Sequence, residues 1–315
     1  MTPDPVVKKS APGISARGKS AVSQYGIFYL MLALPLLYFA IFKYWPLVNA
    51  QIAFKEFMAL DGVWRSPWVG LQNFFTFFNS IYFWQLLRNT IGLSLAKLLV
   101  GLPMAVILAI ALNESSLRRF RRFVQTVTYL PHFLSWIIMY GVLLLLLSPG
   151  DGLINELIKA LGGEPISFLT DPHWYPTIVI LSDVWKEMGW SAIIYLAAIT
   201  GIDPCLYEAA EMEGAGRFKR IWYITLPGIL SAIVTVTLLR LGNILDAGFH
   251  QIFVTYSVPV YGVGDIIDTW VYRQGVLDFQ FSLATAVGLF KGVIGLALVL
   301  FFNKIAKRYT ETSLF

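Results

Sequence analysis

Residues 282–302, SLATAVGLFKGVIGLALVLFF, contain a single charged side chain, Lys291, in a run of 21 residues. A helix of about 20 mostly apolar residues can cross a hydrocarbon core of about 30 Å, so this run predicts a transmembrane helix. Five further apolar runs precede it along the chain. The six predicted spans are residues 26–42, 89–112, 124–147, 177–200, 229–245 and 282–302.

The composition of the whole chain indicates the same environment. Of its 315 residues, 57% are hydrophobic and 14% are charged, whereas soluble domains carry about 25% charged residues. The first apolar run contains Pro35 and lacks a small-residue cleavage site, which indicates an uncleaved helix rather than a secretory signal. We therefore expect an all-α, polytopic integral membrane protein with six transmembrane helices in a lipid membrane.

Basic residues are concentrated in alternate loops, so the net charge of +5 does not form the single patch expected for a nucleic-acid partner. Because cytoplasmic loops carry the excess of Lys and Arg, both termini are predicted to be cytoplasmic. The expected organisation is a cytoplasmic tail at 1–25, a transmembrane domain at 26–303 and a cytoplasmic tail at 304–315. The predicted cytoplasmic side carries Lys8, Lys9, Arg17, Lys19, Arg118, Arg119, Arg121, Arg122, Arg217, Lys219, Arg220, Lys304, Lys307 and Arg308, and the longer loops opposite carry Lys43, Lys55, Arg65, Lys159 and Arg273.

The loop at 201–228, between the fourth and fifth predicted spans, has the pattern of two short helices joined by a turn. Asp203 can cap a helix that has Pro204 at its first position. Gly214 can adopt the left-handed conformation that ends such a helix, and a second helix can follow over 217–225. This shape is suited to docking into a groove of another protein, although an ordinary charged connector has the same composition.

The same loop resembles the signature of binding-protein-dependent importer permeases: Glu-Ala-Ala, three residues, Gly, nine residues, Ile, one residue, Leu-Pro. Glu213 is a departure, since many members carry Asp there, but the charge is retained. The resemblance implies a type I importer permease fold in which the loop is a coupling helix that sits in a cleft of the ATPase subunit. The matching residues are Glu208, Ala209, Ala210, Gly214, Ile224, Leu226 and Pro227.

Hydrolysis of ATP by this chain itself is not expected. The sequence has no Gly-x-x-x-x-Gly-Lys-Ser/Thr loop to hold phosphates, so the resemblance implies that ATP and Mg are bound by partner ATPase subunits. It also implies a second permease subunit, either a heterodimer partner, which is preferred, or a second copy of this chain, together with an extracytoplasmic solute-binding protein and a place in a bacterial inner membrane. No catalytic or metal-binding residues are expected, because Cys205 is the only cysteine and the three histidines lack ligand spacing.

Other segments resemble the carbohydrate branch of these permeases. This resemblance implies that an oligosaccharide or polysaccharide is transported, with an acidic one such as alginate as a candidate. The segments are residues 42–46, 182–190, 248–253, 265–273 and 286–291.

Charged residues inside the predicted spans indicate where substrate could pass, because an ionisable group in a span usually faces a partner or a cavity. The candidate path residues share helical faces and are Asp183, Lys186, Glu187, Trp190, Arg240, Asn243 and Asp246.

Two interpretations of this set remain open. It could line the translocation path, or it could consist of structural ion pairs such as Asp183–Lys186 and Arg240–Asp246. The excess of intramembrane cations, counted with Lys97 and Lys291, over three anions weakly favours an acidic sugar.

Two other classes of function are considered. An ion-coupled secondary sugar transporter would have no use for the coupling loop and often shows internal repeats, which are not evident here. A membrane-embedded transferase would need a nucleophile or metal constellation at the interface, and none is visible in the sequence.

The alternation of basic loops generates a test of the topology. We expect a reporter fused after Phe315, or inserted at 118–122, to be cytoplasmic, and a reporter inserted at 151–171 to be outside. Reporter activity in intact cells measures each location. A cytoplasmic reporter at 151–171 would contradict the six-span arrangement.

Overall fold

The computed structural model describes residues 14–310 apart from residue 243. In that part of the chain, the only strand-type pairing is an isolated bridge between Lys55 and Trp68. The longer α-helices are α1 (Ile14–Phe39), α4 (Phe83–Glu114), α5 (Arg118–Tyr129), α6 (Trp136–Leu147), α7 (Leu153–Ala160), α8 (Tyr175–Thr200), α9 (Pro204–Met212), α12 (Leu230–Gly242) and α16 (Phe281–Thr310).

Shorter helices and single helical turns complete the chain. They lie mainly in the loops and where the long helices bend. They are η1 (Ala40–Tyr44), η2 (Trp45–Phe54), α2 (Gly62–Arg65), α3 (Gln72–Phe78), η3 (Leu130–Phe133), α10 (Arg217–Arg220), η4 (Ile221–Thr225), α11 (Leu226–Gly228), α13 (Phe249–Thr255), η5 (Val258–Val260), α14 (Tyr261–Gly264), α15 (Ile267–Tyr272) and η6 (Arg273–Leu277).

Six spans are found in the described residues only if both single helices and bent helix pairs are counted. Three segments are by themselves long and apolar enough to cross a membrane: Tyr25–Phe54, Phe83–Glu114 and Phe281–Lys304. Up to six spans are reached when each of three bent helix pairs counts as one. The predicted third span is one of these bent pairs, since Arg118–Phe133 and Trp136–Leu147 meet within it at a bend of 112°.

The first span also differs from its prediction. Helical structure continues beyond residue 42 through η1 and η2 to Phe54. Pro46 does not end it, and lies at the start of η2, where the chain passes from a π-helical turn to 3-10 helix. At the other end, Tyr25 has a non-helical backbone that kinks α1 at the predicted boundary between tail and span.

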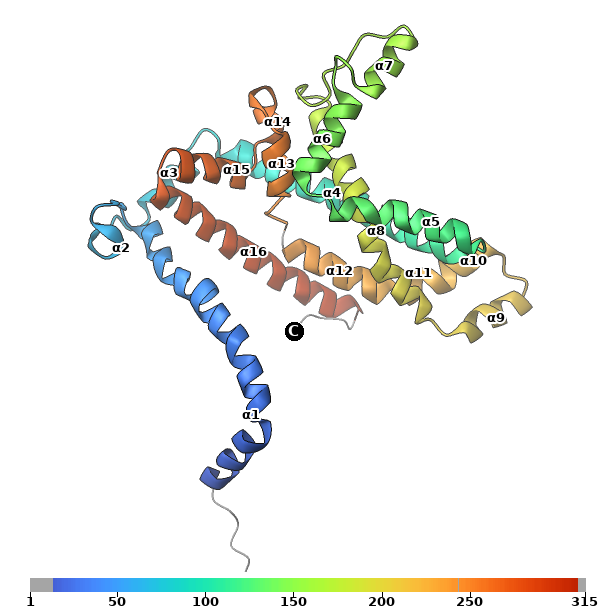
Figure 1. Ribbon diagram of the computed structural model, residues 1–315, viewed down its shortest axis with the longest axis horizontal. Coiled ribbons are helices and arrows are strands. Elements are labelled where there is room, and N and C mark those ends of the chain that lie inside the picture. Colours follow the sequence, from blue (N-terminus) through green and yellow to red (C-terminus); the bar gives the residue numbers. More distant parts are fainter. Residues whose placement is uncertain (1–13, 243, 311–315) are drawn as a thin grey trace, which may run out of the picture.

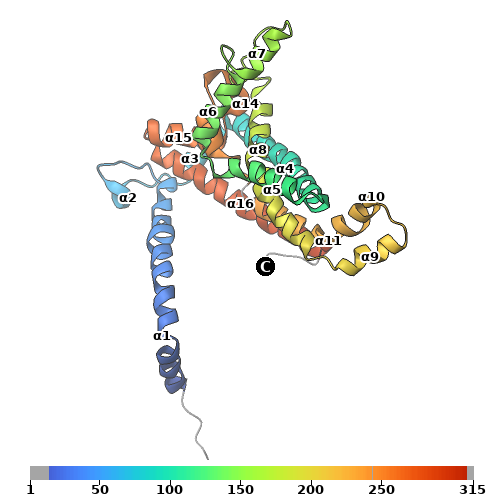
Figure 2. The ribbon, with the colours of Figure 1, turned by 45° about the vertical axis from the view of Figure 1, so that its right-hand side comes forward.

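This first helical segment stands away from the rest of the molecule. Both views show α1 projecting from the bundle, with its far end free of other elements (Figures 1 and 2). None of the residues in its most apolar 18-residue window is buried. Lipid or another subunit therefore has to cover this segment.

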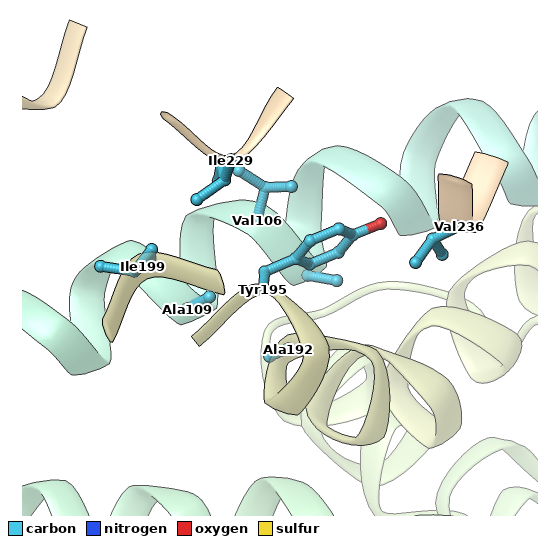
Figure 3. Packing of buried hydrophobic residues seen from close by; sticks show 8 residues of the cluster. Val106, Ala109, Ala192, Tyr195, Ile199, Ile229 and Val236 are labelled. Atoms are coloured by element: carbon cyan, nitrogen blue, oxygen red, sulfur yellow. The ribbon is translucent and has the colours of Figure 1, made fainter. Parts of the chain in front are cut away.

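The packed core lies where α4, α8 and α12 meet. The ring of Tyr195 on α8 lies between Val106 of α4 and Val236 of α12 (Figure 3). Ala109 of α4 and Ala192 of α8 are fully buried in the same cluster (Figure 3). Such small side chains allow two helices to approach closely. In a membrane the lipid is as apolar as the helices, so this close van der Waals packing, rather than the hydrophobic effect, favours their association.

The bend in the third span is held by a buried lysine. Lys186 of α8 donates its Nζ protons to the carbonyl oxygens of Pro131, His132 and Leu134, at 3.1, 2.6 and 2.7 Å. These carbonyls lie at the junction of η3 and α6, where the helical ladder is interrupted. In hydrocarbon a free carbonyl costs several kcal/mol, so one ammonium group replaces the missing helical donors.

A second lysine, Lys97, donates to a backbone carbonyl at the break after the fifth span. Lys97 of α4 donates to the carbonyl oxygen of Ala247 at 2.9 Å and to the side-chain oxygen of Gln251. The chain has already left α12 at Gly242, and Ala247 and Gly248, with positive φ values of 53° and 79°, form the turn before α13. The side-chain amide of Gln251 in turn donates to the carbonyl of Val179 in α8, at 2.7 Å. The break is thus tied to both α4 and α8.

A close backbone contact between α8 and α5 also supports the bend in the third span. A Cβ atom added to Gly189 of α8 would overlap the carbonyl oxygen of Thr128 in α5. Only glycine fits where two backbones touch in this way.

The contacts of Lys186 predict a large cost for its removal. We expect Lys186→Met to lower the free energy of unfolding by roughly 2–4 kcal/mol, because the carbonyls of His132 and Leu134 lose their donor, whereas that of Pro131 keeps the N–H of Leu134. The matched control is Lys159→Met, since the exposed Nζ of Lys159 also donates to a carbonyl, that of Gly150, at 2.7 Å. Its loss should cost about 1 kcal/mol or less. Thermal unfolding of both variants in the same detergent measures the difference, and equal destabilisation would contradict the assignment.

Candidate coupling loop and transport cavity

The loop between α8 and α12 begins with the predicted helix. α9 is bent by 70° from α8, and the side chain of Asp203 accepts the backbone N–H of Cys205 at 2.9 Å. Pro204 occupies the first helical position. The capping predicted from Asp203-Pro204 is therefore confirmed. α9 and α10 lie at the opposite end of the bundle from α7 (Figures 1 and 2).

The turn after α9 is built on a left-handed glycine. Gly214 has a φ of +73°, and the N–H of Ala215 bonds to the carbonyl of Ala210 at 2.8 Å. A Cβ atom added to Gly214 would meet nothing within 4 Å. The conformational need for glycine is confirmed, but within this chain a side chain there would strain the backbone without a clash.

The second helix of the loop is also present, as α10 followed by the π-helical turn η4. The hydroxyl groups of Tyr207 and Thr225 lie 3.0 Å apart and join α9 to η4. An ion pair between Arg220 and Glu211 closes the other side of the turn. The two short helices therefore form one rigid helix–turn–helix.

Exposure divides the signature residues into two groups. Glu208, Ala209, Gly214 and Pro227 are exposed, whereas Ala210, Ile224 and Leu226 are half-buried and anchor the loop.

The two most exposed large apolar residues of this loop do not belong to the signature. Met212 is 89% exposed and Phe218 is 88% exposed. Such apolar exposure at the bundle end, next to Glu208, is typical of a contact surface. Neither residue could be singled out from the sequence, because each fits a helical pattern equally well as a buried residue.

The structure brings some of the candidate path residues together. A cavity of about 450 Å³ lies between α4, α8 and α12, and it is lined by Asp183, Glu187 and Arg240 of the predicted set together with Lys97. Asn243 lies outside the described residues. Asp246 lies at a different cavity, between α13, α15 and α16.

The proposed structural ion pairs within the set are wrong. Neither Asp183–Lys186 nor Arg240–Asp246 occurs among the described residues. The contacts that exist instead are Lys97 to Asp183 at 3.7 Å, Arg240 to the hydroxyl of Ser191 at 2.6 Å, and the carboxylate of Asp246 to the N–H of Phe249 at 3.1 Å.

Two of the four intramembrane cations, Lys186 and Lys291, do not line this cavity. Lys186 is committed to carbonyl oxygens, and Lys291 forms an ion pair with Asp268. The charged lining of the cavity is therefore balanced, with two cations and two carboxylates. The number of intramembrane charges therefore gives no support of its own for an acidic sugar.

Glu187 and Trp190 meet a residue that lies more than 50 positions earlier in the chain and was not predicted to join them. The Nδ1 atom of His132 lies 3.0 Å from a carboxylate oxygen of Glu187. The ring of His132 stacks on Trp190 with centroids 4.5 Å apart and planes inclined by 1°. Because His132 belongs to the bend in the third span, only the folded chain brings it to this place.

No cluster of three or more His, Cys, Asp or Glu side chains that could hold a metal ion occurs in the described part of the chain. The chemistry that this arrangement offers is hydrogen bonding in a balanced polar cavity, together with a rigid surface at the bundle end.

Comparison with known proteins identifies the family. The model of the family described as binding-protein-dependent transport system inner membrane component matches residues 101–311. The chain belongs to this family. It is accordingly a multi-pass membrane protein, and the predicted type I importer permease fold is confirmed.

Individual relatives of this permease family are close. The polygalacturonan/rhamnogalacturonan transport system permease protein YteP of Bacillus subtilis (strain 168) is 44% identical over 287 residues, which cover 91% of this chain and 89% of the relative. Protein LplB of the same organism is 42% identical over 313 residues, which cover 98% of both chains.

A solved structure extends the likeness to three dimensions. A chain of a bacterial ABC transporter involved in the import of the acidic polysaccharide alginate matches with a TM-score of 0.87 and 39% identity. The match covers 93% of this permease and 99% of the solved chain. A structure of the alginate transporter in complex with its pentasaccharide-bound periplasmic protein matches equally well, with a TM-score of 0.87.

Proposed function

We propose that this chain is the non-catalytic permease subunit of an ATP-driven importer that carries oligosaccharides or polysaccharides across a bacterial inner membrane. The observation that carries this proposal is the rigid, exposed helix–turn–helix at 201–228, found in a chain 44% identical to a polysaccharide permease. Acidic chains are the proposed substrates, because similar transporters are named for polygalacturonan, rhamnogalacturonan and alginate.

The helix–turn–helix is proposed to dock into a cleft of a separate ATPase, which binds ATP and Mg. Glu208 presents a carboxylate that can accept charge-assisted hydrogen bonds from a basic residue of that subunit. The exposed Met212 and Phe218 would supply apolar contact on both sides of the turn. Since Tyr207 and Arg220 hold the two helices together, movement of the ATPase would be transmitted to α8 and α12 as a unit.

Two other partners follow from the same proposal. The most apolar part of the segment Tyr25–Phe54 has no buried residue, and a second permease subunit in a heterodimer is proposed to cover part of it. An extracytoplasmic solute-binding protein is proposed to deliver the substrate, because the similar alginate transporter forms a complex with a periplasmic protein that holds an alginate pentasaccharide.

The cavity between α4, α8 and α12 is the proposed substrate path. Its volume of about 450 Å³ falls within the range of small-molecule sites. Sugar hydroxyl groups can donate to Asp183 and Glu187, while Arg240 can donate to a substrate carboxylate.

Coupling is tested with glycine and glutamate variants of the loop. We expect Gly214→Leu and Glu208→Ala to leave the permease in the membrane but to abolish most substrate-stimulated ATP hydrolysis. The matched controls are Gly162→Leu and Glu164→Ala. Gly162 also has a positive φ, +85°, and an added Cβ would meet nothing within 4 Å, so both glycine variants carry the same backbone strain of about 1–2 kcal/mol.

The measurements are co-purification of the ATPase and stimulated ATP hydrolysis in the complete complex. Normal association and hydrolysis in both loop variants would show that the loop is only a connector. Uptake by reconstituted permease without any ATPase would instead favour the ion-coupled sugar transporter considered above.

The acidic substrate is tested at the cavity. We expect Arg240→Gln to impair uptake of a galacturonate oligosaccharide by about tenfold, because a charge-assisted hydrogen bond is lost. Uptake of a neutral galactose oligosaccharide of equal length should change little. Competition between the two sugars for uptake by membrane vesicles gives the comparison, and equal impairment would remove the assignment of Arg240 to a carboxylate.

A further inference from the structure

A second cavity lies apart from the proposed path. It has a volume of about 450 Å³ and is lined by α13, α15, η6 and the first turns of α16. By the predicted topology, the first turns of α16 lie at the extracytoplasmic side of the membrane. The polar and aromatic side chains of its lining are Asp246, Phe249, His250, Asp268, Tyr272 and Thr285.

The backbone on both sides of this cavity is strained. Ala247, next to Asp246, has a φ of 53°, and Phe279, just before α16, has a φ of 57°. These are the only non-glycine residues with positive φ in the described part of the chain. Between them the chain forms the π-helical turn η6. Strained residues and π-helical turns both gather at functional sites.

The carboxylates of the cavity retain acceptor capacity. Asp246 uses one oxygen to accept the N–H of Phe249, and Asp268 uses one oxygen in its ion pair with Lys291. Within the described residues, the second oxygen of each carboxylate has no hydrogen-bond partner. Burial raises the pKa of Asp268, and the ion pair with Lys291 opposes this rise.

An aromatic wall completes the cavity. The ring of Tyr272 meets the ring of Phe253 edge to face, with centroids 4.8 Å apart and an angle of 74°. Phe249 lies beside both rings, at 5.3 Å from Phe253 and 6.5 Å from Tyr272. The ring of Tyr272 is therefore held in place before any ligand arrives, and it offers a flat apolar surface beside hydrogen-bond acceptors.

We propose that this cavity binds one uncharged sugar ring of the transported chain, with hydroxyl groups donating to Asp246 and Asp268 and the ring face against Tyr272. The inference rests on the function proposed above and adds to it a second subsite, nearer the predicted outer end. A uronate carboxylate is disfavoured, because two carboxylates against one Lys291 leave the cavity negative.

The test uses the complete importer and two hexasaccharides. One alternates rhamnose and galacturonate rings, and the other contains galacturonate alone. We expect Tyr272→Ala to raise KM for the alternating hexasaccharide by about fivefold to tenfold and to leave KM for the all-acidic one within about twofold. Tyr272→Phe retains the ring and should restore the wild-type values. Tyr82→Ala, which removes an exposed tyrosine outside both cavities, serves as the matched control.

If the Tyr272→Ala variant does not assemble, Asp246→Asn provides a second test, because asparagine preserves the shape of the aspartate side chain. It should also raise KM selectively for the alternating hexasaccharide. Unchanged KM values in these variants, or an equal rise for both sugars, would overturn the uncharged-ring subsite while leaving the proposed function intact. A wild-type complex stimulated by neither hexasaccharide would overturn the proposed function, and the subsite with it.

Discussion

The structure depends on satisfying backbone carbonyl groups where helices break inside an apolar environment. Lys186 supplies donors to three carbonyls at the bend of the third span. Lys97 supplies donors at the break after the fifth. Without such donors, non-helical backbone is tolerated in hydrocarbon only at a cost of several kcal/mol. These two side chains therefore permit the bends that separate α5 from α6 and α12 from α13. The two polar cavities lie beside the second of these bends.

This structural use of charge changes how intramembrane ionisable groups are interpreted. A charged residue in a span usually marks a partner or a cavity, and here the partner of Lys186 is the backbone itself. Asp183 and Arg240 remain at a cavity, but each is already held by a neighbour, Lys97 or Ser191. Polar side chains held in this way can receive a substrate without first losing much conformational freedom.

The proposed coupling loop and the proposed substrate path lie on different parts of the same helices. α8 carries Asp183 and Glu187 along its length and leads into α9 after Gly201. α12 carries Arg240 near one end and follows α11 at the other. A force applied at the helix–turn–helix would thus reach both walls of the cavity. The packed contact of α4 with these helices around Tyr195 provides the rigid connection (Figure 3).

The apolar spans, the capped helix at Asp203-Pro204 and the glycine turn at Gly214 could be predicted from the residue pattern, because each follows from composition or from contacts between residues close in the chain. The roles of the charged residues could not, since they depend on how the helices pack. Lys186 lies on the same helical face as Asp183, yet its ammonium group bonds to carbonyls more than 50 residues away in the chain. Local spacing cannot reveal such a contact, because it arises from a bend whose free carbonyls become acceptors only when another helix brings a donor to them.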